Sequence, residues 1–179
     1  NLMASFDAET IFRHYEEVIS GGGIIYDSDL EGTKTDSVRT LDAPFKERLH
    51  KELELKNKPF TIAGVLEIAK ENGVKLFPVS FKSILETLSE ETENPRLRGL
   101  VRSYNVIGVS LSLGLVNMPP DSLQKTIESI FSRKPEIARI NQQTANYSYN
   151  YATAKFENFN YVLSKTEKEP GTILVQGFQ

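Results

Sequence analysis

Apolar residues recur at helical spacing through most of the chain, which predicts a series of helices with one buried face each. The first helix would carry its apolar face on four positions: Ile11, Tyr15, Val18 and Ile19. Ser5 or Asp7 would cap it, and the three glycines 21–23 would end it. The full set of expected helices covers residues 5–20, 44–56, 59–72, 80–90, 94–115 and 121–131, with a last helix that begins at Pro135.

Short apolar runs between these helices predict β-strands. Residues 24–26 and 75–79 form two such runs, and Pro78 places the second at a sheet edge or at the strand's end. Residues 1–4 look like the last residues of a buried strand, and residues 171–177 read as a further strand. Strands that alternate with helices predict an α/β fold. We expect a Rossmann-like open sheet with flanking helices, incomplete at its N-terminus and ending in the first strand of a following domain.

The composition removes several classes of function. The 179 residues include no cysteine, which excludes a disulfide scaffold, a cysteine zinc site, a thiolate-bound iron–sulfur cluster and a cysteine nucleophile within this chain. With 21 basic and 24 acidic residues, the net charge of −3 argues against a dominant nucleic-acid footprint. No apolar run approaches the roughly 20 residues of a membrane helix. These features predict a cytoplasmic domain.

Two glycine or carboxylate motifs have plain structural explanations. The glycines 21–23 follow a helix and precede a strand, the reverse of a phosphate loop, so they predict a helix stop. Asp27, Asp29 and Glu31 mimic the opening of a calcium loop, but Val38 stands where that loop needs a glutamate. No metal site is therefore expected. The loop still follows the carboxyl end of a strand, where open α/β sheets collect ligands, and so remains a candidate site.

The chain offers weak candidates for nucleophilic catalysis. Ser110 lies between glycines in a sequence that faintly resembles a nucleophile elbow, but Ser112 breaks the pattern and no histidine follows. His14 and His50 lie on expected helices without partners at metal-ligand spacing, so we interpret them as surface or boundary residues. We expect no catalytic residue in this segment.

Two further groups of residues allow more than one interpretation. Arg96, Arg98 and Arg102 would occupy the first two turns of the helix 94–115, where they could bind a phosphate or carboxylate; a solvated or intersubunit face is favoured. The C-terminal region also contains a dense aromatic cluster, for which we expect burial against a partner subunit or a neighbouring domain. Its members are Tyr147, Tyr149, Tyr151, Phe156, Phe159 and Tyr161.

Several segments, in order, carry a family resemblance. They are Gly-Gly-Ile-Ile-Tyr-Asp-Ser-Asp at 22–29, Phe-Pro-Val-Ser at 77–80, the stretch from Asn94-Pro95 through 104–108, the pattern N-x3-A-x3-Y-x-Y-A from Asn141, and 172–177. Together they resemble the gamma domain of the thiamine-diphosphate-dependent 2-oxoacid:ferredoxin oxidoreductases, in the archaeal two-subunit type with a fused gamma-alpha subunit. The family's glycine-rich first turn would lie before Asn1, and residues 30–73 are longer than its usual connection.

The resemblance implies a division of the chain and a role for it. Residues 1–164 would be a partial gamma domain, 165–170 a linker and 171–179 the start of the alpha domain. The whole enzyme would oxidatively decarboxylate a 2-oxoacid with coenzyme A and pass electrons to ferredoxin. This segment would be a non-catalytic packing domain, in which Arg102 and Asn105 lie nearest to a coenzyme A contact.

The cofactors would lie elsewhere in such an enzyme. Thiamine diphosphate, Mg²⁺ and the [4Fe–4S] cluster would belong to other domains or to a partner beta subunit. The absence of cysteine in this chain is consistent with that division. An alternative stays open at this stage. The chain could be a stand-alone, non-catalytic interaction module whose aromatic C-terminal helix binds a partner protein.

Overall fold

The computed structural model describes residues 1–156 of the chain. Three strands, β1 (Leu2–Ala4), β2 (Gly23–Asp27) and β3 (Lys75–Val79), form one parallel sheet in the order β1-β2-β3. The described helices are α1 (Ala8–His14), α2 (Ala43–Leu55), α3 (Ile62–Glu71), α4 (Phe81–Glu91), α5 (Tyr104–Leu115), α6 (Asp121–Ile130) and α7 (Pro135–Lys155). The expected Rossmann-like open sheet with flanking helices is confirmed.

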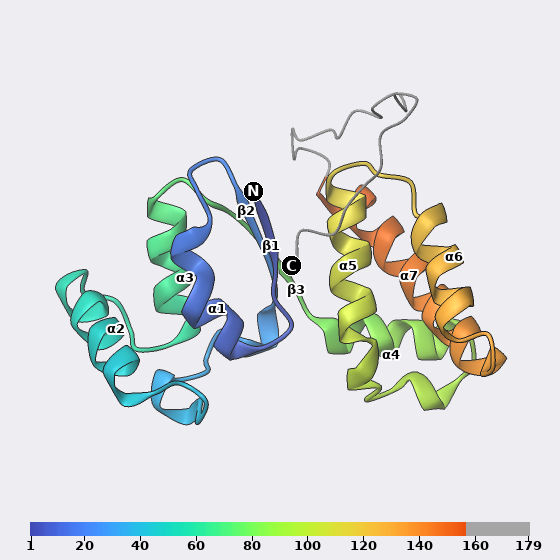
Figure 1. Cartoon of the computed structure of the whole chain (residues 1–179), viewed down its shortest axis with the longest axis horizontal. Coiled ribbons are helices and arrows are strands. Elements are labelled where there is room, and N and C mark those ends of the chain that lie inside the picture. The colour runs from blue at the N-terminus through green and yellow to red at the C-terminus, as the bar shows by residue number, and fades with distance from the viewer. Residues whose placement is uncertain (157–179) are drawn as a thin grey trace, which may run out of the picture.

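The sheet separates two groups of helices (Figure 1). Side chains alternate between the faces of β2, so Ile24 and Tyr26 join the core beneath α1, α2 and α3. Ile25 points the other way and packs with Phe77 and Val79 of β3 against α4 and α5. Two apolar cores therefore lie on opposite faces of one thin sheet.

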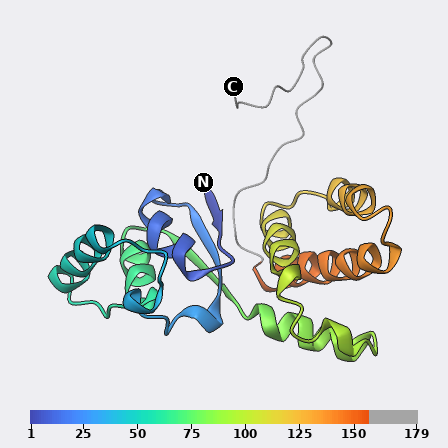
Figure 2. The ribbon, with the colours of Figure 1, turned by 60° about the horizontal axis from the view of Figure 1, so that its bottom comes forward.

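The second group of helices continues from β3. Figure 2 shows α4 leaving the end of β3 and leading to the helices α5, α6 and α7. Helices α5 and α7 lie very close at Gly114, where an added Cβ would stand 2.8 Å from the Cβ of Ala152. Small residues at this crossing thus set how closely the two helices pack.

Several sequence-based boundaries are confirmed. Strand β3 has the predicted limits, with Pro78 on an edge strand of the described sheet, and α7 begins at Pro135. Ser80 caps α4 by accepting a hydrogen bond from the Ser83 N–H. Gly21 takes a φ of 77°, as a chain reversal before β2 requires, and the same strand extends one residue beyond the prediction at each end.

The long helix predicted over residues 94–115 is wrong. Two 3₁₀ turns, Pro95–Leu97 and Val101–Ser103, precede an α-helix that begins only at Tyr104. Gly99 between them has a φ of 75°, which interrupts right-handed helix. Asn94 does cap the first turn, through the Arg96 N–H. Asn94 and Pro95 correctly indicated where helical structure begins, but that structure is a single 3₁₀ turn.

The first helix is shorter than predicted. Asp7, rather than Ser5, accepts the capping hydrogen bond from the Thr10 N–H, and α1 ends at His14. A 3₁₀ turn, Tyr15–Glu17, follows and changes the helical register. As a result Val18 is buried, whereas Ile19 is 65% exposed.

Some sequence-based predictions concern residues beyond 156. The domain boundary at 164, the linker 165–170 and the strand at 171–177 lie outside the described residues, as do Phe159 and Tyr161. Among residues 1–156, none of the helices combines the length and the apolar character that a membrane crossing requires.

Candidate functional site

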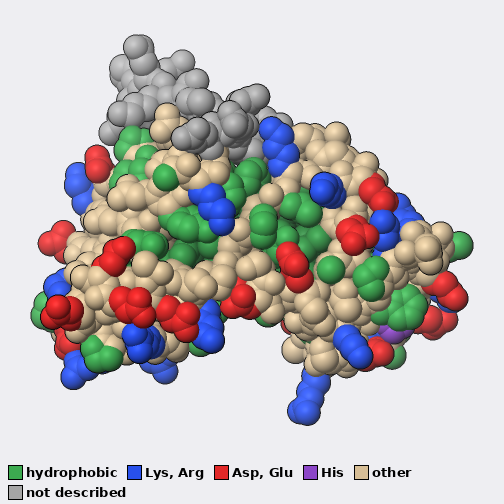
Figure 3. All heavy atoms as spheres, turned by 180° about the vertical axis from the view of Figure 1, so that it is seen from behind, with side chains coloured by type: hydrophobic (Ala, Val, Ile, Leu, Met, Phe, Trp, Pro, Cys, Tyr) green, Lys and Arg blue, Asp and Glu red, His purple; other side chains and the backbone are tan. Residues whose placement is uncertain are grey.

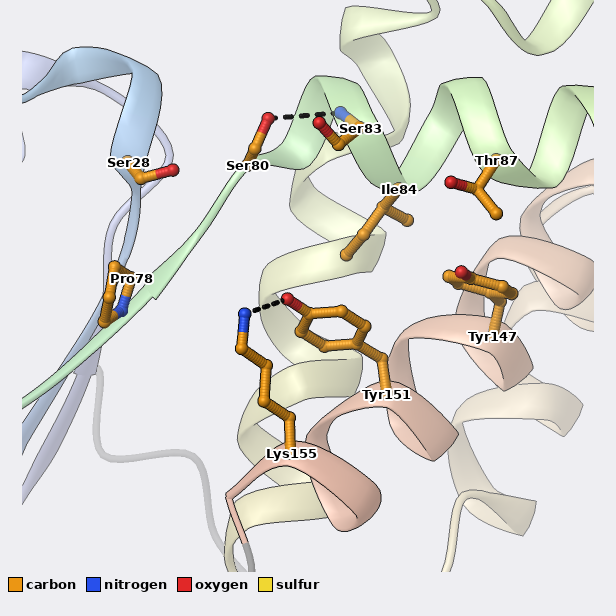
Figure 4. Close-up of a pocket in the computed structure, with 9 residues that line it drawn as sticks. All are labelled: Ser28, Pro78, Ser80, Ser83, Ile84, Thr87, Tyr147, Tyr151 and Lys155. Atoms are coloured by element: carbon orange, nitrogen blue, oxygen red, sulfur yellow. Dashed lines mark hydrogen bonds between the residues drawn. The ribbon is translucent and has the colours of Figure 1, made fainter.

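An open groove of about 420 Å³ lies at the carboxyl ends of β2 and β3, between the sheet and α7 (Figure 4). Six of its nine lining residues carry hydroxyl groups: Ser28, Ser80, Ser83, Thr87, Tyr147 and Tyr151. Pro78, Ile84 and Lys155 complete the lining. Ligands of open α/β sheets bind outside the carboxyl ends of the strands, so this groove is the candidate site of the described residues.

Asp27 anchors the wall of the groove that the sheet provides. It is 4% exposed at the end of β2, and its Oδ1 accepts hydrogen bonds from the N–H of Asp29 (3.2 Å) and of Phe81 (3.3 Å). Burial raises the pKa of the Asp27 carboxyl above its usual range, against the opposing effect of these two N–H groups. One side chain thereby joins the turn after β2 to the start of α4.

The resemblance of residues 27–32 to a calcium loop has a structural explanation. Asp27 holds the backbone, and the Oδ2 of Asp29 accepts a hydrogen bond from the Ser80 hydroxyl at 3.1 Å. Glu31 accepts one from the Tyr26 hydroxyl at 2.8 Å. The described residues contain no group of three or more acidic or histidine side chains arranged to hold a metal ion.

The opposite wall of the groove comes from α7. Tyr147, Tyr151 and Lys155 follow one another at four-residue spacing, so all three lie on the same helical face. Lys155 Nζ donates a hydrogen bond to the Tyr151 hydroxyl at 2.5 Å and lies 4.9 Å from the centre of the Tyr151 ring. Figure 4 shows the lysine extending toward Pro78, with its amine beside the phenol oxygen.

The three arginines do not lie in the first two turns of one helix, contrary to the sequence-based prediction. Arg96 pairs with Glu136 at 2.6 Å and Arg98 pairs with Glu90 at 3.1 Å, both at the surface. Arg102 lies exposed in the second 3₁₀ turn. The break at Gly99 separates these side chains, because no continuous helix aligns them. Arg96 and Arg98 therefore serve in ion pairs within the chain.

Arg102 and Asn105 are both exposed and flank the start of α5. Neither lines the groove. Tyr104 between them packs edge-on against Phe81, with ring centres 5.4 Å apart. Burial, followed by the charges of Asp27 and Asp29, raises the pKa of Tyr104. The start of α5 thus lies near the turn after β2.

Other candidates from the sequence are structural. Ser110 is fully buried inside α5 and donates a hydrogen bond to the Val106 carbonyl, so it is no nucleophile elbow. His14 contacts Glu17 at the surface, and His50 stacks on Phe60 with ring centres 4.6 Å apart. Both histidines occupy partly exposed helix positions, as predicted.

The described part of the aromatic cluster packs partly within the chain. Tyr147, Tyr151 and Phe156 border the core formed by β3, α4 and α5. Phe156 meets the Phe77 ring edge-on at 5.2 Å and the Tyr151 ring at 6.2 Å. Contacts inside the domain therefore account for part of the aromatic density.

Sequence reasoning missed the groove as a unit. Ser28 and Ser80 could be found because they follow strand ends, and the loop after β2 was a candidate on that ground. The stripe of Tyr147, Tyr151 and Lys155 shows a helical period. No sequence signal indicated that these three residues of α7 face the carboxyl ends of the strands.

Asp27 offers a first prediction. Asp27→Ala is expected to lower the free energy of unfolding by about 1–3 kcal/mol, because the buried Phe81 N–H loses its acceptor. Asp27→Asn keeps an oxygen in place and should cost less.

The raised pKa of Asp27 means that its contribution to stability is present at low pH and is lost as the pH rises through that pKa. Asp27→Asn should therefore gain relative to wild type between about pH 3 and about pH 7. Urea denaturation at both pH values measures this, and equal losses for the two variants would contradict it.

The sequence of the chain matches a known protein family. Residues 1–151 match the family described as pyruvate ferredoxin/flavodoxin oxidoreductase. The chain belongs to this family. The match runs from β1 to Tyr151 in α7, so it includes every residue that lines the groove except Lys155. The resemblance inferred from the sequence motifs is confirmed at the level of the family.

Curated relatives agree with the family. The chain is 26% identical over 152 residues to "2-oxoacid:ferredoxin oxidoreductase 2, subunit alpha" of Aeropyrum pernix, with 85% of this chain and 24% of the relative covered. It is 29% identical over 156 residues to subunit alpha of oxidoreductase 1 from Sulfurisphaera tokodaii, covering 87% and 24%. A Saccharolobus solfataricus subunit alpha is 31% identical over 141 residues, covering 78% and 22%. The chain spans about a quarter of the length of these relatives.

Proposed function

We propose that this chain is a non-catalytic domain of a 2-oxoacid:ferredoxin oxidoreductase, packing against the rest of the enzyme and helping to enclose its active site. The observation that carries the proposal is the family match over residues 1–151. The relatives are alpha subunits of 2-oxoacid:ferredoxin oxidoreductases. A stand-alone interaction module is not favoured, since these relatives carry the matching region within an enzyme subunit.

The surface of the domain suits such packing. Figure 3 shows apolar side chains gathered in the middle of one face, between the two groups of helices. Val101 and Val109, before and within α5, are 63% and 42% exposed. In the described sheet, β1 pairs on one side only, with β2. Exposed apolar residues and an open strand edge are both features that protein contacts cover.

The proposed holoenzyme performs coenzyme A-dependent oxidative decarboxylation of a 2-oxoacid, with the electrons passing to ferredoxin. Its iron–sulfur cluster needs thiolate ligands, and this chain contains no cysteine. Asp27 Oδ1 is engaged by two backbone N–H groups, and the described residues contain no group of three or more acidic or histidine side chains that could hold a metal ion. The residues present therefore do not fit the cluster or Mg²⁺, and we place these groups and thiamine diphosphate on other domains or on a beta subunit. A cytoplasmic location is part of the same proposal.

The test is an assay of the full-length protein together with its co-purifying subunit. Reduction of ferredoxin should require both a 2-oxoacid and coenzyme A, and omission of either should abolish it. A preparation that contains bound thiamine diphosphate and iron but reduces no ferredoxin with any of several 2-oxoacids would overturn the proposal.

Arg102 and Asn105 are the proposed contacts of this domain with coenzyme A. Arg102 has no ion-pair partner in the described part of the chain, unlike Arg96 and Arg98. Arg102→Ala should raise the KM for coenzyme A about tenfold, the effect of losing one charge-assisted contact to phosphate, and leave the KM for the 2-oxoacid unchanged. Steady-state kinetics with each substrate varied in turn measures the two constants.

A matched control for this variant is Arg133→Ala, which removes an equally charged and exposed residue from the connection between α6 and α7. It should change neither constant. Asn105→Ala should shift the same KM in the same direction, by less, because a neutral hydrogen bond is weaker. Unchanged coenzyme A kinetics in Arg102→Ala would reject the contact.

A further inference from the structure

Two carboxylates from different elements meet at one buried phenol. Tyr15, in the 3₁₀ turn after α1, is 3% exposed, and its hydroxyl donates a hydrogen bond to Glu52 Oε2 of α2 at 2.6 Å. Glu16 Oε1 lies 3.4 Å from the same hydroxyl. A phenol has one hydrogen to donate, so it satisfies one of the two carboxylates at a time. The other carboxylate needs water or a proton of its own.

The surroundings of Glu16 favour such a proton. Burial, followed by the charge of Glu52 and a hydrogen bond with it, raises the pKa of Glu16. Once protonated, the Glu16 carboxyl can donate its hydrogen to Glu52, which then accepts hydrogen bonds from both neighbours. With both carboxyls ionised, two like charges face each other across the phenol. Burial also raises the pKa of Tyr15, so the phenol stays a donor in both states.

Arg48 is the cation that opposes this effect. It belongs to α2, one turn before Glu52, and its charge lowers the pKa of Glu16. It has no ion pair in the described part of the chain, and its guanidinium lies 5.2 Å from the centre of the Phe45 ring.

The other charged groups on the neighbouring elements are engaged elsewhere or exposed. Arg13 binds Glu9 and Asp42, His14 binds Glu17, Glu47 binds Lys51, His50 binds Thr35, Lys46 binds the Asp36 carbonyl, and Lys58 binds Glu67 and Glu71. Glu54, Lys56 and Lys70 are exposed. Arg48 alone therefore compensates part of the charge that Glu16 and Glu52 share.

Helix α2 lies at the outer end of the molecule, beyond α3 (Figure 1). Its inner face buries Leu49 and Leu53 in the core beneath it. At its start, Asp42 lies 3.7 Å from Arg13 of α1. The hydrogen bond from Tyr15 to Glu52 joins its last turn to the 3₁₀ turn after α1. A helix at the periphery that rests on few polar links is the kind of element that opens locally.

We propose that Tyr15, Glu16 and Glu52 form a proton-dependent latch for α2. With one proton shared between the two carboxyls, the latch is closed and α2 is held against the turn Tyr15–Glu17. With both carboxyls ionised, their repulsion opens the latch, and α2 detaches locally while the sheet and α3 stay folded. The latch goes beyond the proposed oxidoreductase function, because it requires no substrate and no turnover.

The sign of the pH dependence follows from Glu16. Because its pKa is raised in the folded protein, the contribution of the closed latch is present at low pH and is lost as the pH rises through that pKa. Acid therefore closes the latch, and neutral or alkaline solution opens it.

The test is hydrogen–deuterium exchange of the full-length protein with its co-purifying subunit, followed by mass spectrometry between about pH 5 and about pH 8. Each exchange rate is divided by the intrinsic rate of an unprotected amide at that pH. Peptides from α2 should then exchange about fivefold faster at the higher pH, whereas peptides from α3 should keep their rate.

Three variants separate the latch from a general effect of charge. Glu16→Gln is neutral at every pH and can donate to Glu52, so α2 should exchange at the slow rate throughout. Tyr15→Phe keeps the buried ring but removes the donor, so α2 should exchange faster than in wild type at about pH 8. Glu54→Gln is the matched control: it removes the same charge from an exposed position of α2 and should keep the wild-type pH dependence.

Four results would overturn the latch. They are exchange of α2 that does not depend on pH in the wild type, an unchanged pH dependence in Glu16→Gln, a pH dependence that Glu54→Gln abolishes, and an equal change in α3. The last result would make the pH effect one of global unfolding. Because none of these measurements depends on ferredoxin reduction, failure of the latch and failure of the proposed function are distinguishable.

Discussion

Gly64→Ala is expected to lower the free energy of unfolding by about 3 kcal/mol. Gly64 is buried in the first turn of α3, and a Cβ there would stand 2.0 Å from the Pro59 carbonyl oxygen and 3.1 Å from Leu53 Cδ2. Alanine favours helix over glycine by about 1 kcal/mol, which is too little to offset the clash. Relief requires the backbone to move, because the nearest atom belongs to the main chain.

The movement would also disturb the connection between α2 and α3. Pro59 O accepts the Thr61 N–H, and the neighbouring Lys58 binds Glu67 at 3.0 Å and also Glu71, both on α3. Loss of these contacts adds to the cost of the substitution. Thermal denaturation followed by circular dichroism should show a melting temperature lower by roughly 10 °C.

Gly32→Ala is the matched control for this variant. Gly32 is exposed after β2, has no left-handed backbone angle and has no atom within 4 Å of an added Cβ. Its substitution should change the free energy of unfolding by less than about 0.5 kcal/mol. Equal melting temperatures for the two variants would contradict the close approach of Gly64 to the Pro59 carbonyl oxygen.

Gly108→Ala is expected to cost about 2 kcal/mol, for a different reason. Gly108 is buried in α5, and a Cβ there would lie 2.0 Å from Cε1 of Phe6, which follows β1. The obstacle is a partly buried ring rather than backbone, so the ring can turn away and lose its contact with the core of β3, α4 and α5. The loss of stability therefore comes from the reduced burial of Phe6 and not from distortion of a turn.

A double-mutant cycle tests this account. In a Phe6→Ala background, Gly108→Ala should become neutral or stabilising by up to about 1 kcal/mol, because the ring is absent and alanine favours helix. Gly114→Ala, which meets Ala152 and the Tyr149 carbonyl oxygen, should cost the same with or without Phe6. Additive effects of Phe6→Ala and Gly108→Ala would contradict the contact. Urea denaturation provides all the values.

The local elements were largely predictable. Ser80 as a cap, Pro135 at the start of α7 and the limits of β3 follow from residue types acting over a few positions. The segment 94–103 was not, because Asn94-Pro95 starts a single 3₁₀ turn as readily as a long helix. The left-handed Gly99 ends the turn, and glycine is compatible with either conformation.

The candidate site was predictable only in part. The turn after β2 could be identified as a candidate because strand ends in α/β sheets collect ligands. The family resemblance rested on ordered motifs and needed no coordinates. Neither source indicated that Lys155 and Tyr151 of α7 line the same groove as that turn.

From the order of residues alone follow the α/β class, the family, the absence of thiolate chemistry and most of the element limits, since these depend on composition and on neighbours within a few residues. Folding in space supplies the rest: the groove between β3 and α7, the approach of Phe6 to Gly108, and the separation of Arg102 from its neighbouring arginines. A helical period names the residues on one face but not the element against which that face packs. That choice depends on the packing of segments far apart in the chain.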